Sequence, residues 1–419
     1  MAMRRIGIVV GGGPAPGTNA VIAAAVIEAH KLGCVPIGFQ DGLHWLAQRY
    51  TDEQEELTMG EVSRAALTGG VMLRSSRTDV GADPALLRNT VDALRKLAID
   101  GLVAIGGDDL VHSAIAIERE AQGRIKVVMV PKTIDNDLGV PEQVVTLGYE
   151  TARHVGVALV ANLMEDARTS GRWYLGVTMG RPTGHLTLGI GKAASATCTI
   201  IPEELGPGPV RLADIADIVE GSIIKRRALG KKHGVVLLSE ALVERFDPAE
   251  VAELEDVDRD AQGNIRVGEI DLGRKVVNAV TLRLEKRGIK MSVVDKTIGY
   301  ELRCAAPLPM EAEYGRDLGY AAVRHLATVG GGVMVTIQGG GPQFVPLADC
   351  VDPITGRGRQ RAVDVASENY QVARAYMVRL EAPDFADDAK VAALAAAGGF
   401  DPDGFRRHFA RLEASLAAR

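Results

Sequence analysis

Cysteine is scarce in this chain of 419 residues, and long hydrophobic runs are missing from it. Its four cysteines are far apart and form no C-x-x-C pair, which argues against a disulfide framework and against a zinc site. The first residues, MAMRRIGIVVGGG, hold only a short apolar run, too short for a signal peptide or a membrane span. We therefore expect an untargeted cytoplasmic protein without a membrane partner.

An excess of basic charge is also absent. Lys and Arg total 48 against 54 Asp and Glu, which gives a formal net charge of −6. This balance argues against a general binder of nucleic acid. The one basic cluster, KRRALGKKH at 225–233, is expected to be a solvated helix end and turn. Any anion site must therefore be local.

Short apolar runs that end in glycine alternate with amphipathic stretches, a pattern typical of β-turn-α units on a mostly parallel sheet. The pattern predicts strands at 5–10, 34–39, 101–105, 126–130, 173–177, 199–201, 234–238 and 332–337. It predicts helices at 18–32, 84–97, 110–122 and 149–167, an exposed excursion at 244–269 and terminal helices from about 386. The length suits two α/β domains, each with a doubly wound, Rossmann-like sheet.

Three glycine-containing or polar loops follow predicted strands in the first half of the chain: GGGPAPGTN (11–19), GGDDLVHS (106–113) and PKTIDNDLG (131–139). Ligands of open α/β sheets bind beyond the carboxyl ends of strands, so these loops are expected to line one rim. The first loop departs from both standard phosphate loops, because Pro16 replaces a dinucleotide-loop glycine and Thr18 replaces the P-loop lysine. A general anion site at a helix N-terminus and a glycine turn without a ligand both remain open.

The third loop carries the most chemistry. Lys132, Thr133, Asp135 and Asp137 offer a cation, a hydroxyl and two carboxylates within six positions. Such a set suits phosphoryl transfer, in which a base takes a hydroxyl proton and cations hold the moving group. The alternative is a turn that is stabilised by its own Asx hydrogen bonds.

Two arginines flank the predicted strand at 173–177. Arg172 stands at its start and Arg181 just past its end, so the strand separates them by roughly 25 Å. They cannot serve the same phosphate within one subunit. Arg172 is therefore either a surface residue or part of a site in a neighbouring subunit.

Seven motifs occur in the order and spacing found in one enzyme family: GGGPAPGTN, RSSRTD (74–79), GGDD, PKTIDND, MGRPTGH (179–185), IPEE (201–204) and GYELRC (299–304). Over about residues 5–345 the chain resembles the 6-phosphofructokinases. The resemblance implies a phosphofructokinase fold with three parts. These are a phosphate-donor domain at 1–149 plus about 305–345, a sugar-phosphate domain at 150–304 and a C-terminal helical extension at 346–419.

Two positions make the chain similar to the pyrophosphate-dependent branch of that family. Asp109 and Lys132 stand where ATP-using relatives typically have glycine. The resemblance implies Mg²⁺-dependent, reversible phosphoryl transfer from pyrophosphate to the 1-hydroxyl of fructose 6-phosphate, with sedoheptulose 7-phosphate as another candidate acceptor. Two alternatives remain: an ATP-dependent phosphofructokinase that tolerates Asp109, and a catalytically silent sugar-phosphate sensor, against which the intact set of acidic residues argues.

The resemblance also assigns roles to residues. Asp135 matches the catalytic base, Asp108 the Mg²⁺ ligand, and Asp137 the acidic residue that assists both. Groups that hold the donor or the transferring phosphoryl are matched by the Gly12 backbone N–H, Arg77, Asp109, Lys132, Thr133 and Arg181. Contacts to the sugar phosphate are matched by Met179, Gly180, Glu203, Tyr300 and Arg303, together with Thr133, Asp135 and Arg181. Arg172 matches an arginine from the partner subunit, which implies at least a homodimer with a shared site. A second such arginine is replaced here by Val294, and Lys296 is the candidate substitute.

Overall fold

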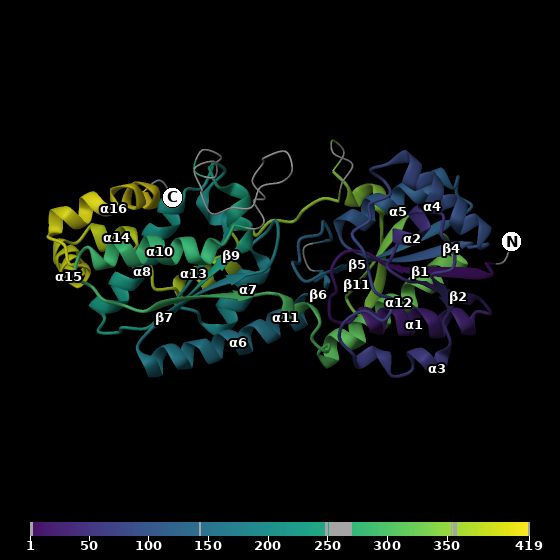
Figure 1. Ribbon diagram of the computed structural model, residues 1–419, viewed down its shortest axis with the longest axis horizontal. Helices are drawn as coiled ribbons and strands as arrows, with labels where there is room; N and C mark the ends of the chain where they lie inside the picture. The colour runs from purple at the N-terminus through teal and green to yellow at the C-terminus, as the bar shows by residue number, and fades with distance from the viewer. Residues whose placement is uncertain are drawn as a thin grey trace. The chain divides into compact units, whose positions relative to one another are not determined.

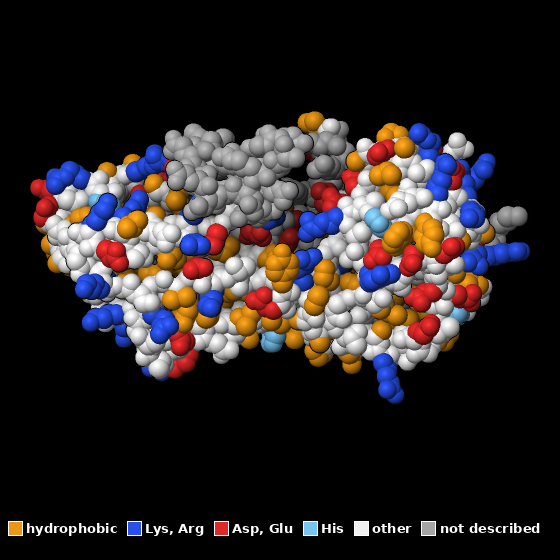
Figure 2. Space-filling view, viewed as in Figure 1, with side chains coloured by type: hydrophobic (Ala, Val, Ile, Leu, Met, Phe, Trp, Pro, Cys, Tyr) orange, Lys and Arg blue, Asp and Glu red, His pale blue; other side chains and the backbone are white. Residues whose placement is uncertain are grey.

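A computed structural model describes residues 3–141, 144–247, 250, 270–352, 354 and 358–417. The chain divides into two compact units. Unit 1 comprises Met1–Val155 and Tyr300–Arg361, and unit 2 comprises Gly156–Gly299 and Ala362–Arg419. Within the described residues, no helix has the length and apolar character that crossing a membrane would require. On the face shown in Figure 2, Lys and Arg side chains are interspersed with Asp and Glu.

Unit 1 is built on an eight-stranded sheet. Its strands are β1 (Arg5–Val10), β2 (Val35–Phe39), β3 (Gln54–Glu56), β4 (Gly101–Gly106), β5 (Lys126–Thr133), β6 (Leu147–Gly148), β11 (Val333–Gln338) and β12 (Gly341–Pro346). The strand order is β12-β11-β5-β4-β1-β2-β3, and β6 pairs with the end of β5. Only β3 and β12 are antiparallel to their neighbours. From β1 the order proceeds to β2 on one side and to β4 on the other, so the sheet has a topological switch point there.

Helices cover both faces of this sheet (Figure 1). They are α1 (Thr18–Lys31), α2 (His44–Ala47), α3 (Met59–Val62), α4 (Pro84–Lys96), α5 (Asp108–Glu120), α11 (Tyr300–Arg303) and α12 (Pro309–Thr328), with short 3₁₀ turns at Ala65–Leu67 and Leu347–Cys350. The apolar strand residues alternate between two cores. Val103 and Ile105 pack with α1 and α12, whereas Leu102 and Ala104 pack with α4 and α5. This alternation follows from the two-residue period of a strand and makes the sheet doubly wound.

Unit 2 holds a parallel four-stranded sheet in the order β10-β7-β9-β8. Its strands are β7 (Trp173–Thr178), β8 (Cys198–Ile200), β9 (Gly234–Ser239) and β10 (Val293–Ile298). Its helices are α7 (His185–Ala194), α8 (Leu212–Ala228), α10 (Leu272–Glu285), α13 (Glu368–Ala375), α14 (Ala382–Phe385), α15 (Asp388–Gly398) and α16 (Pro402–Ala417), with 3₁₀ turns at Pro202–Leu205 and Glu240–Arg245. The division between units falls within α6 (Tyr149–Ser170). Helices α8 and α10 share one apolar core with the strands.

The predicted strands and long helices are confirmed, with three informative differences. Helix α5 begins at Asp108 and not at 110, and β5 continues to Thr133, because β6 pairs with Lys132 and Thr133. Strand β10 was not predicted, since it is an edge strand whose middle residues are polar and exposed. Most of the predicted excursion at 244–269 lies outside the described residues.

The division into units also differs from the predicted domain boundaries. Residues 346–361 belong to unit 1, and residues 362–419 belong to unit 2. In this division the C-terminal extension is not a unit of its own. Helices α14, α15 and α16 form an apolar cluster with α8 through Ile224, Phe405 and Phe409.

Candidate active site

The three candidate loops of unit 1 meet at one edge of the sheet. Strands β1, β4 and β5 are adjacent and parallel, with Val10 opposite Ile105 and Gly106 opposite Pro131. Their carboxyl ends therefore lead into the three loops side by side, as the sequence predicts. This edge lies at the switch point of the sheet, where open α/β proteins bind ligands.

Asp108 and Asp109 form the first turn of helix α5, which follows Gly107 as its N-cap. Carboxylates at a helix N-terminus are stabilised by the helix dipole, typically by about 0.3–1 kcal/mol each when exposed. One oxygen of Asp108, Oδ1, is buried, whereas Asp109 is exposed. The two neighbouring carboxylates thus have different environments, since Asp108 is partly buried and Asp109 is exposed.

Lys132 is a buried cation between the glycine loop and the carboxylates. Its side chain lies in β5, the residue is only 2% exposed, and Nζ donates a hydrogen bond to the Gly13 carbonyl oxygen. Burial, together with the positive charges of Arg303 and Arg77, lowers the pKa of Lys132 from 10.5 to about 7. Such a lysine gains a strong preference for its charged form when an anion binds beside it.

The glycine loop at 11–13 packs against Arg303. A Cβ at Gly13 would overlap the Arg303 guanidinium, so only glycine permits this approach. Gly12 has a φ of 78°, and its N–H donates to the Ser76 carbonyl oxygen at 2.9 Å. The role expected for the Gly12 N–H therefore requires this hydrogen bond to be replaced. Arg303 lies in unit 1 beside Lys132 and adds a positive charge to the donor loop. The family resemblance had instead assigned Arg303 to the sugar phosphate.

The segment from Thr133 to Asp137 brings a hydroxyl and two carboxylates together. The Asp135 N–H donates to Thr133 Oγ1 at 3.1 Å, and Asn136 takes a left-handed conformation with a φ of 55°. Burial, and to a smaller extent the negative charge of Asp108, raise the pKa of Asp137 to about 6 against the lowering effects of its hydrogen bonds and of Arg361. Asp108 and Asp137 therefore lie close enough to repel each other.

Sequence reasoning missed two residues at this edge, Gly358 and Arg361. The Arg361 backbone N–H donates to the Asp137 carbonyl oxygen at 2.6 Å, and its guanidinium donates to the Asn136 carbonyl oxygen at 3.1 Å. A Cβ at Gly358 would overlap the Asp108 carboxylate. Neither residue belongs to a motif with a recognised mechanism, so only the structure reveals these contacts.

In unit 2, residues 179–181 follow strand β7. The Met179 N–H donates to the Ile298 carbonyl oxygen at 2.9 Å, and the Gly180 N–H donates to Glu240 at 3.3 Å. Glu240 also accepts from Arg181 Nη2 at 2.6 Å. Sequence reasoning missed Glu240, because a single glutamate after a strand carries no signal of its own.

Glu203 is oriented by two backbone groups. Its Oε1 accepts from the Gly184 N–H at 2.9 Å and from the Val363 N–H at 3.1 Å. Its Oε2 is buried and accepts no hydrogen bond from any of the residues that the structure describes. Glu203, with Tyr370 and Arg374, lines a hollow of about 590 Å³ in unit 2. The carboxylate is thus fixed on one side and retains an unused acceptor on the other.

Of the remaining predicted residues, Tyr300 and Lys296 are exposed and Arg172 is partly buried. Tyr300 opens α11 and is 73% exposed, and Lys296 lies exposed on the edge strand β10. Arg172 immediately precedes β7, with its Nε 3.9 Å from Asp166 Oδ2. Arg172 and Arg181 do stand at opposite ends of β7, as the sequence indicates.

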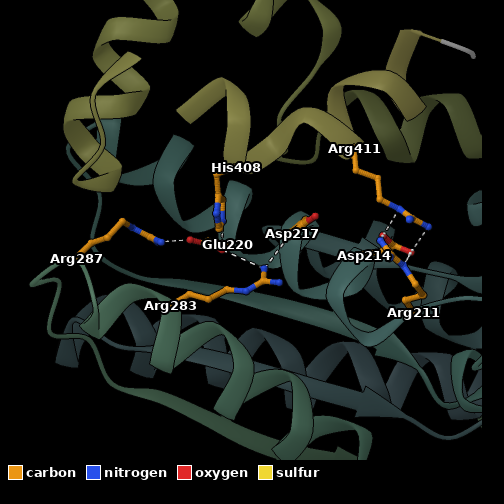
Figure 3. Close-up of polar contacts among 8 residues, drawn as sticks. All are labelled: Arg211, Asp214, Asp217, Glu220, Arg283, Arg287, His408 and Arg411. Atoms are coloured by element: carbon orange, nitrogen blue, oxygen red, sulfur yellow. Dashed lines mark hydrogen bonds and ion pairs between the residues drawn. The ribbon is translucent and has the colours of Figure 1, made fainter. Parts of the chain in front are cut away.

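A second polar cluster, in unit 2, has the composition of a metal site but a different arrangement (Figure 3). Asp217, Glu220 and His408 lie within ligand distance of one another. Glu220 is fully buried, yet it pairs with Arg287 and lies 3.2 Å from Arg283 Nη1. Burial would raise the pKa of Glu220, but His408 and the two arginines lower it. With two guanidinium groups on it, the cluster is an internal ion network and not a cation site.

A buried lysine, glycine-rich backbone and several carboxylates that follow adjacent parallel strands are typical of α/β proteins that handle phosphoryl groups. The chain belongs to the phosphofructokinase family, since the family model for phosphofructokinase matches residues 5–326.

The chain is similar along nearly its whole length to pyrophosphate–fructose 6-phosphate 1-phosphotransferases. It is 46% identical over 411 residues to that of Thermotoga maritima, with 97% of this chain and 98% of the relative covered. It is 43% identical over 418 residues to that of Naegleria fowleri, with 97% and 95% covered. The structure of a pyrophosphate-dependent phosphofructokinase from Marinobacter aquaeolei has the same fold, with a TM-score of 0.68, 15% identity and coverage of 90% and 91%.

Proposed function

We propose that this protein transfers a phosphoryl group reversibly between pyrophosphate and the 1-hydroxyl of fructose 6-phosphate. The choice of pyrophosphate as the donor rests on the position of Lys132. This buried cation lies at the end of β5 beside the glycine loop, and the exposed Asp109 follows the neighbouring strand β4. Pyrophosphate is short and highly charged, so a buried cation attracts it strongly. The Asp109 carboxylate repels the additional phosphate group of a nucleotide donor such as ATP. The names of the two full-length relatives support the same donor.

Magnesium fits the acidic residues of this site. Asp108 and Asp137 are close, partly buried and mutually repelling, and a divalent cation with oxygen ligands would relieve that repulsion. Asp108 would hold the ion, with Asp137 beside it. When bound, Mg²⁺ would neutralise part of the charge on the pyrophosphate.

The chain's own residues supply the remaining chemistry. Asp135 takes the proton of the sugar 1-hydroxyl, whose oxygen attacks one phosphorus of pyrophosphate in line while the bond to the bridging oxygen breaks and phosphate leaves. Lys132, Arg77 and Arg303 hold the charge of the donor. Since Lys132 is buried and held by its hydrogen bond to Gly13, it stabilises the transition state with little reorganisation.

The sugar phosphate is bound by residues of unit 2 and by the partner subunit. Met179, Gly180, Arg181 and Glu203 contact the sugar, and Tyr300 is a further candidate contact. The packing of Arg303 on Gly13 favours its role at the donor over the expected role at the sugar. Arg172, at the far end of β7, serves the site of a second copy in a homodimer or a larger assembly, and Lys296 on the edge strand is a second candidate. Four free cysteines suit a reducing, cytoplasmic setting.

The experiment that tests this function is a two-donor assay. Fructose 6-phosphate and sedoheptulose 7-phosphate are each offered with pyrophosphate or ATP, and product formation is followed by coupled enzymes. We expect a higher kcat/KM with pyrophosphate for the preferred sugar. A higher kcat/KM with ATP would establish the ATP-dependent alternative, and no turnover with either donor would favour a sugar-phosphate sensor.

The depressed pKa of Lys132 predicts proton uptake on pyrophosphate binding. In the free protein the lysine is half protonated near pH 7, whereas the anion raises its pKa in the complex. Below pH 7 this group leaves affinity unchanged, and above pH 7 affinity falls by up to about tenfold per pH unit until the pKa of the complex is reached. Calorimetric titration in two buffers of different ionisation enthalpy measures the uptake.

Lys132→Met is the matched control for this pH dependence, because the ionisation of pyrophosphate itself is the same for both proteins. The variant should bind more weakly and lose the lysine-dependent part of the pH profile. Identical profiles for the two proteins would show that the protonation state of Lys132 does not change on binding.

Replacement of Arg172 tests the shared site. Arg172→Ala should raise the KM for the sugar phosphate by at least about tenfold with a small change in kcat, as expected when one charged contact to a substrate is lost. Mixing and reassociating Arg172→Ala and Asp135→Ser subunits should recover part of the activity, since one of the two shared sites then has neither change. No recovery in verified mixed oligomers would indicate a self-contained site.

A further inference from the structure

Residues 358–361, hereafter the clamp segment, lie against the loop that carries Asp135 and Asp137. Gln360 forms an antiparallel bridge with Leu138, and the Gly139 N–H donates to the Arg359 carbonyl oxygen at 2.7 Å. The clamp segment lies beyond the residues 5–326 that the family model matches. It therefore supplies this loop with a neighbour from a distant part of the chain.

Arg361 makes most of the side-chain contacts between the clamp segment and the loop. Its Nη1 donates to the carbonyl oxygens of Val144 at 2.9 Å and Pro141 at 3.3 Å. Its Nη2 donates to the Asn136 carbonyl oxygen and to Asn136 Oδ1. One rigid guanidinium thus satisfies acceptors at both ends of the loop, which a flexible ammonium could not do at once.

These contacts fix the residue between the two carboxylates. Asn136 is in the left-handed region, which costs most residues free energy and persists only where the surroundings impose it. Its side chain also accepts from the Thr146 N–H at 3.2 Å. The peptide planes on either side of Asn136 set the directions of Asp135 and Asp137.

We propose that Arg361 is a positioning residue for the reaction, which holds the Asn136 turn so that the carboxylates of Asp135 and Asp137 keep their reactive directions. The proposal rests on the proposed function, because those carboxylates act only if the site transfers phosphoryl groups. The hydrogen bonds of the Arg361 guanidinium described above go to carbonyl oxygens of the loop and to Asn136 Oδ1, and its positive charge also acts on Asp137. Its effect is on orientation, and a misplacement of about 1 Å at a reacting group costs about 10²-fold in rate.

Arg359 provides a matched control from the same segment. Its side-chain Nε donates to the Val351 carbonyl oxygen at 2.8 Å, and within the described residues 136–141 and 144 its side chain makes no hydrogen bond to the loop. Its contact with Gly139 uses the backbone and survives replacement of the side chain. Arg359→Ala therefore removes an arginine from the clamp segment while it leaves the loop contacts in place.

The test combines kinetics with amide hydrogen exchange in the full chain. Arg361→Ala should lower kcat by about 10²-fold, change either KM by less than about threefold and speed exchange at residues 136–140. Millimolar guanidinium should recover part of kcat, and Arg359→Ala should resemble the parent in every measurement. If Arg361→Ala does not fold, Arg361→Lys replaces it, with a smaller kcat loss in the same direction.

Each outcome decides a separate point. A folded Arg361 variant with parental kcat, or parental exchange at 136–140, would overturn the positioning role. An equal loss in Arg359→Ala would reduce the effect to general destabilisation and overturn it too. If the parent protein shows no phosphoryl transfer at all, the proposed function fails, and the exchange measurement alone then decides whether Arg361 orders the loop.

Discussion

Asp135→Ser should lower kcat by at least about 10³-fold and leave both KM values within about threefold of the parent protein. General bases contribute typically 10²–10⁴-fold, and a group that is needed mainly in the transition state affects kcat and not ground-state binding. Serine retains a polar side chain of small volume at the position whose backbone N–H donates to Thr133. The loop geometry is thereby preserved while the base is lost.

Steady-state kinetics in both directions of the reaction measure this effect, since the same carboxylate serves both. Asp92→Ser is a suitable control, because Asp92 is an exposed aspartate of α4 that pairs with exposed Arg49 at 3.1 Å. Such surface pairs contribute little, so the control should retain full activity. A loss of less than about tenfold in Asp135→Ser would mean that another group removes the proton.

Replacement of Asp109 and Lys132 together by glycine should reverse the order of the two donors. A carboxylate about 4 Å from a nucleotide phosphate costs about 1 kcal/mol in water and about 4 kcal/mol at an effective dielectric of 20. This corresponds to roughly fivefold to a thousandfold against ATP. Loss of the buried Lys132 cation should lower kcat/KM for pyrophosphate by at least about 10²-fold.

The single variants separate the two contributions. Asp109→Gly alone should raise kcat/KM for ATP with a small effect on pyrophosphate, and Lys132→Gly alone should mainly impair pyrophosphate. Asp109→Gly also removes an acid from the first turn of α5, so the free energy of unfolding should fall by about 1 kcal/mol. If kcat/KM falls equally for both donors in the double variant, the charge of Asp109 does not exclude the nucleotide.

Local sequence signals were sufficient to predict the three strands that lead into the candidate loops of unit 1. Short apolar runs predicted β1, β4 and β5, and the adjacency of their ends follows from the rules of parallel sheets. The same signals could not show that β5 continues through Lys132, because that extension depends on pairing with β6, some fifteen residues further on in the chain. Lys132 is buried at this extended end of the strand, and its burial lowers its pKa.

The contacts made over long sequence separations were beyond prediction from the sequence. Glu240 and Arg361 lie in segments without a recognised motif, and their partners Arg181 and Asn136 are far from them in the chain. Arg303 was assigned through its motif, but a motif does not report that its guanidinium packs on Gly13. Tertiary packing, and not local propensity, places these three side chains.

The ion network around Glu220 sets a limit on how far the chain can be shortened. Glu220 lies in α8, Arg283 lies in α10 and Arg287 lies just after α10. His408 lies in α16, the last helix that the structure describes. Removal of α16 would strip the histidine from a buried charge and uncover Phe405 and Phe409. The last helix is therefore not a detachable tail, and a protein trimmed to the residues that the family model matches would lose part of the charge balance on which unit 2 depends.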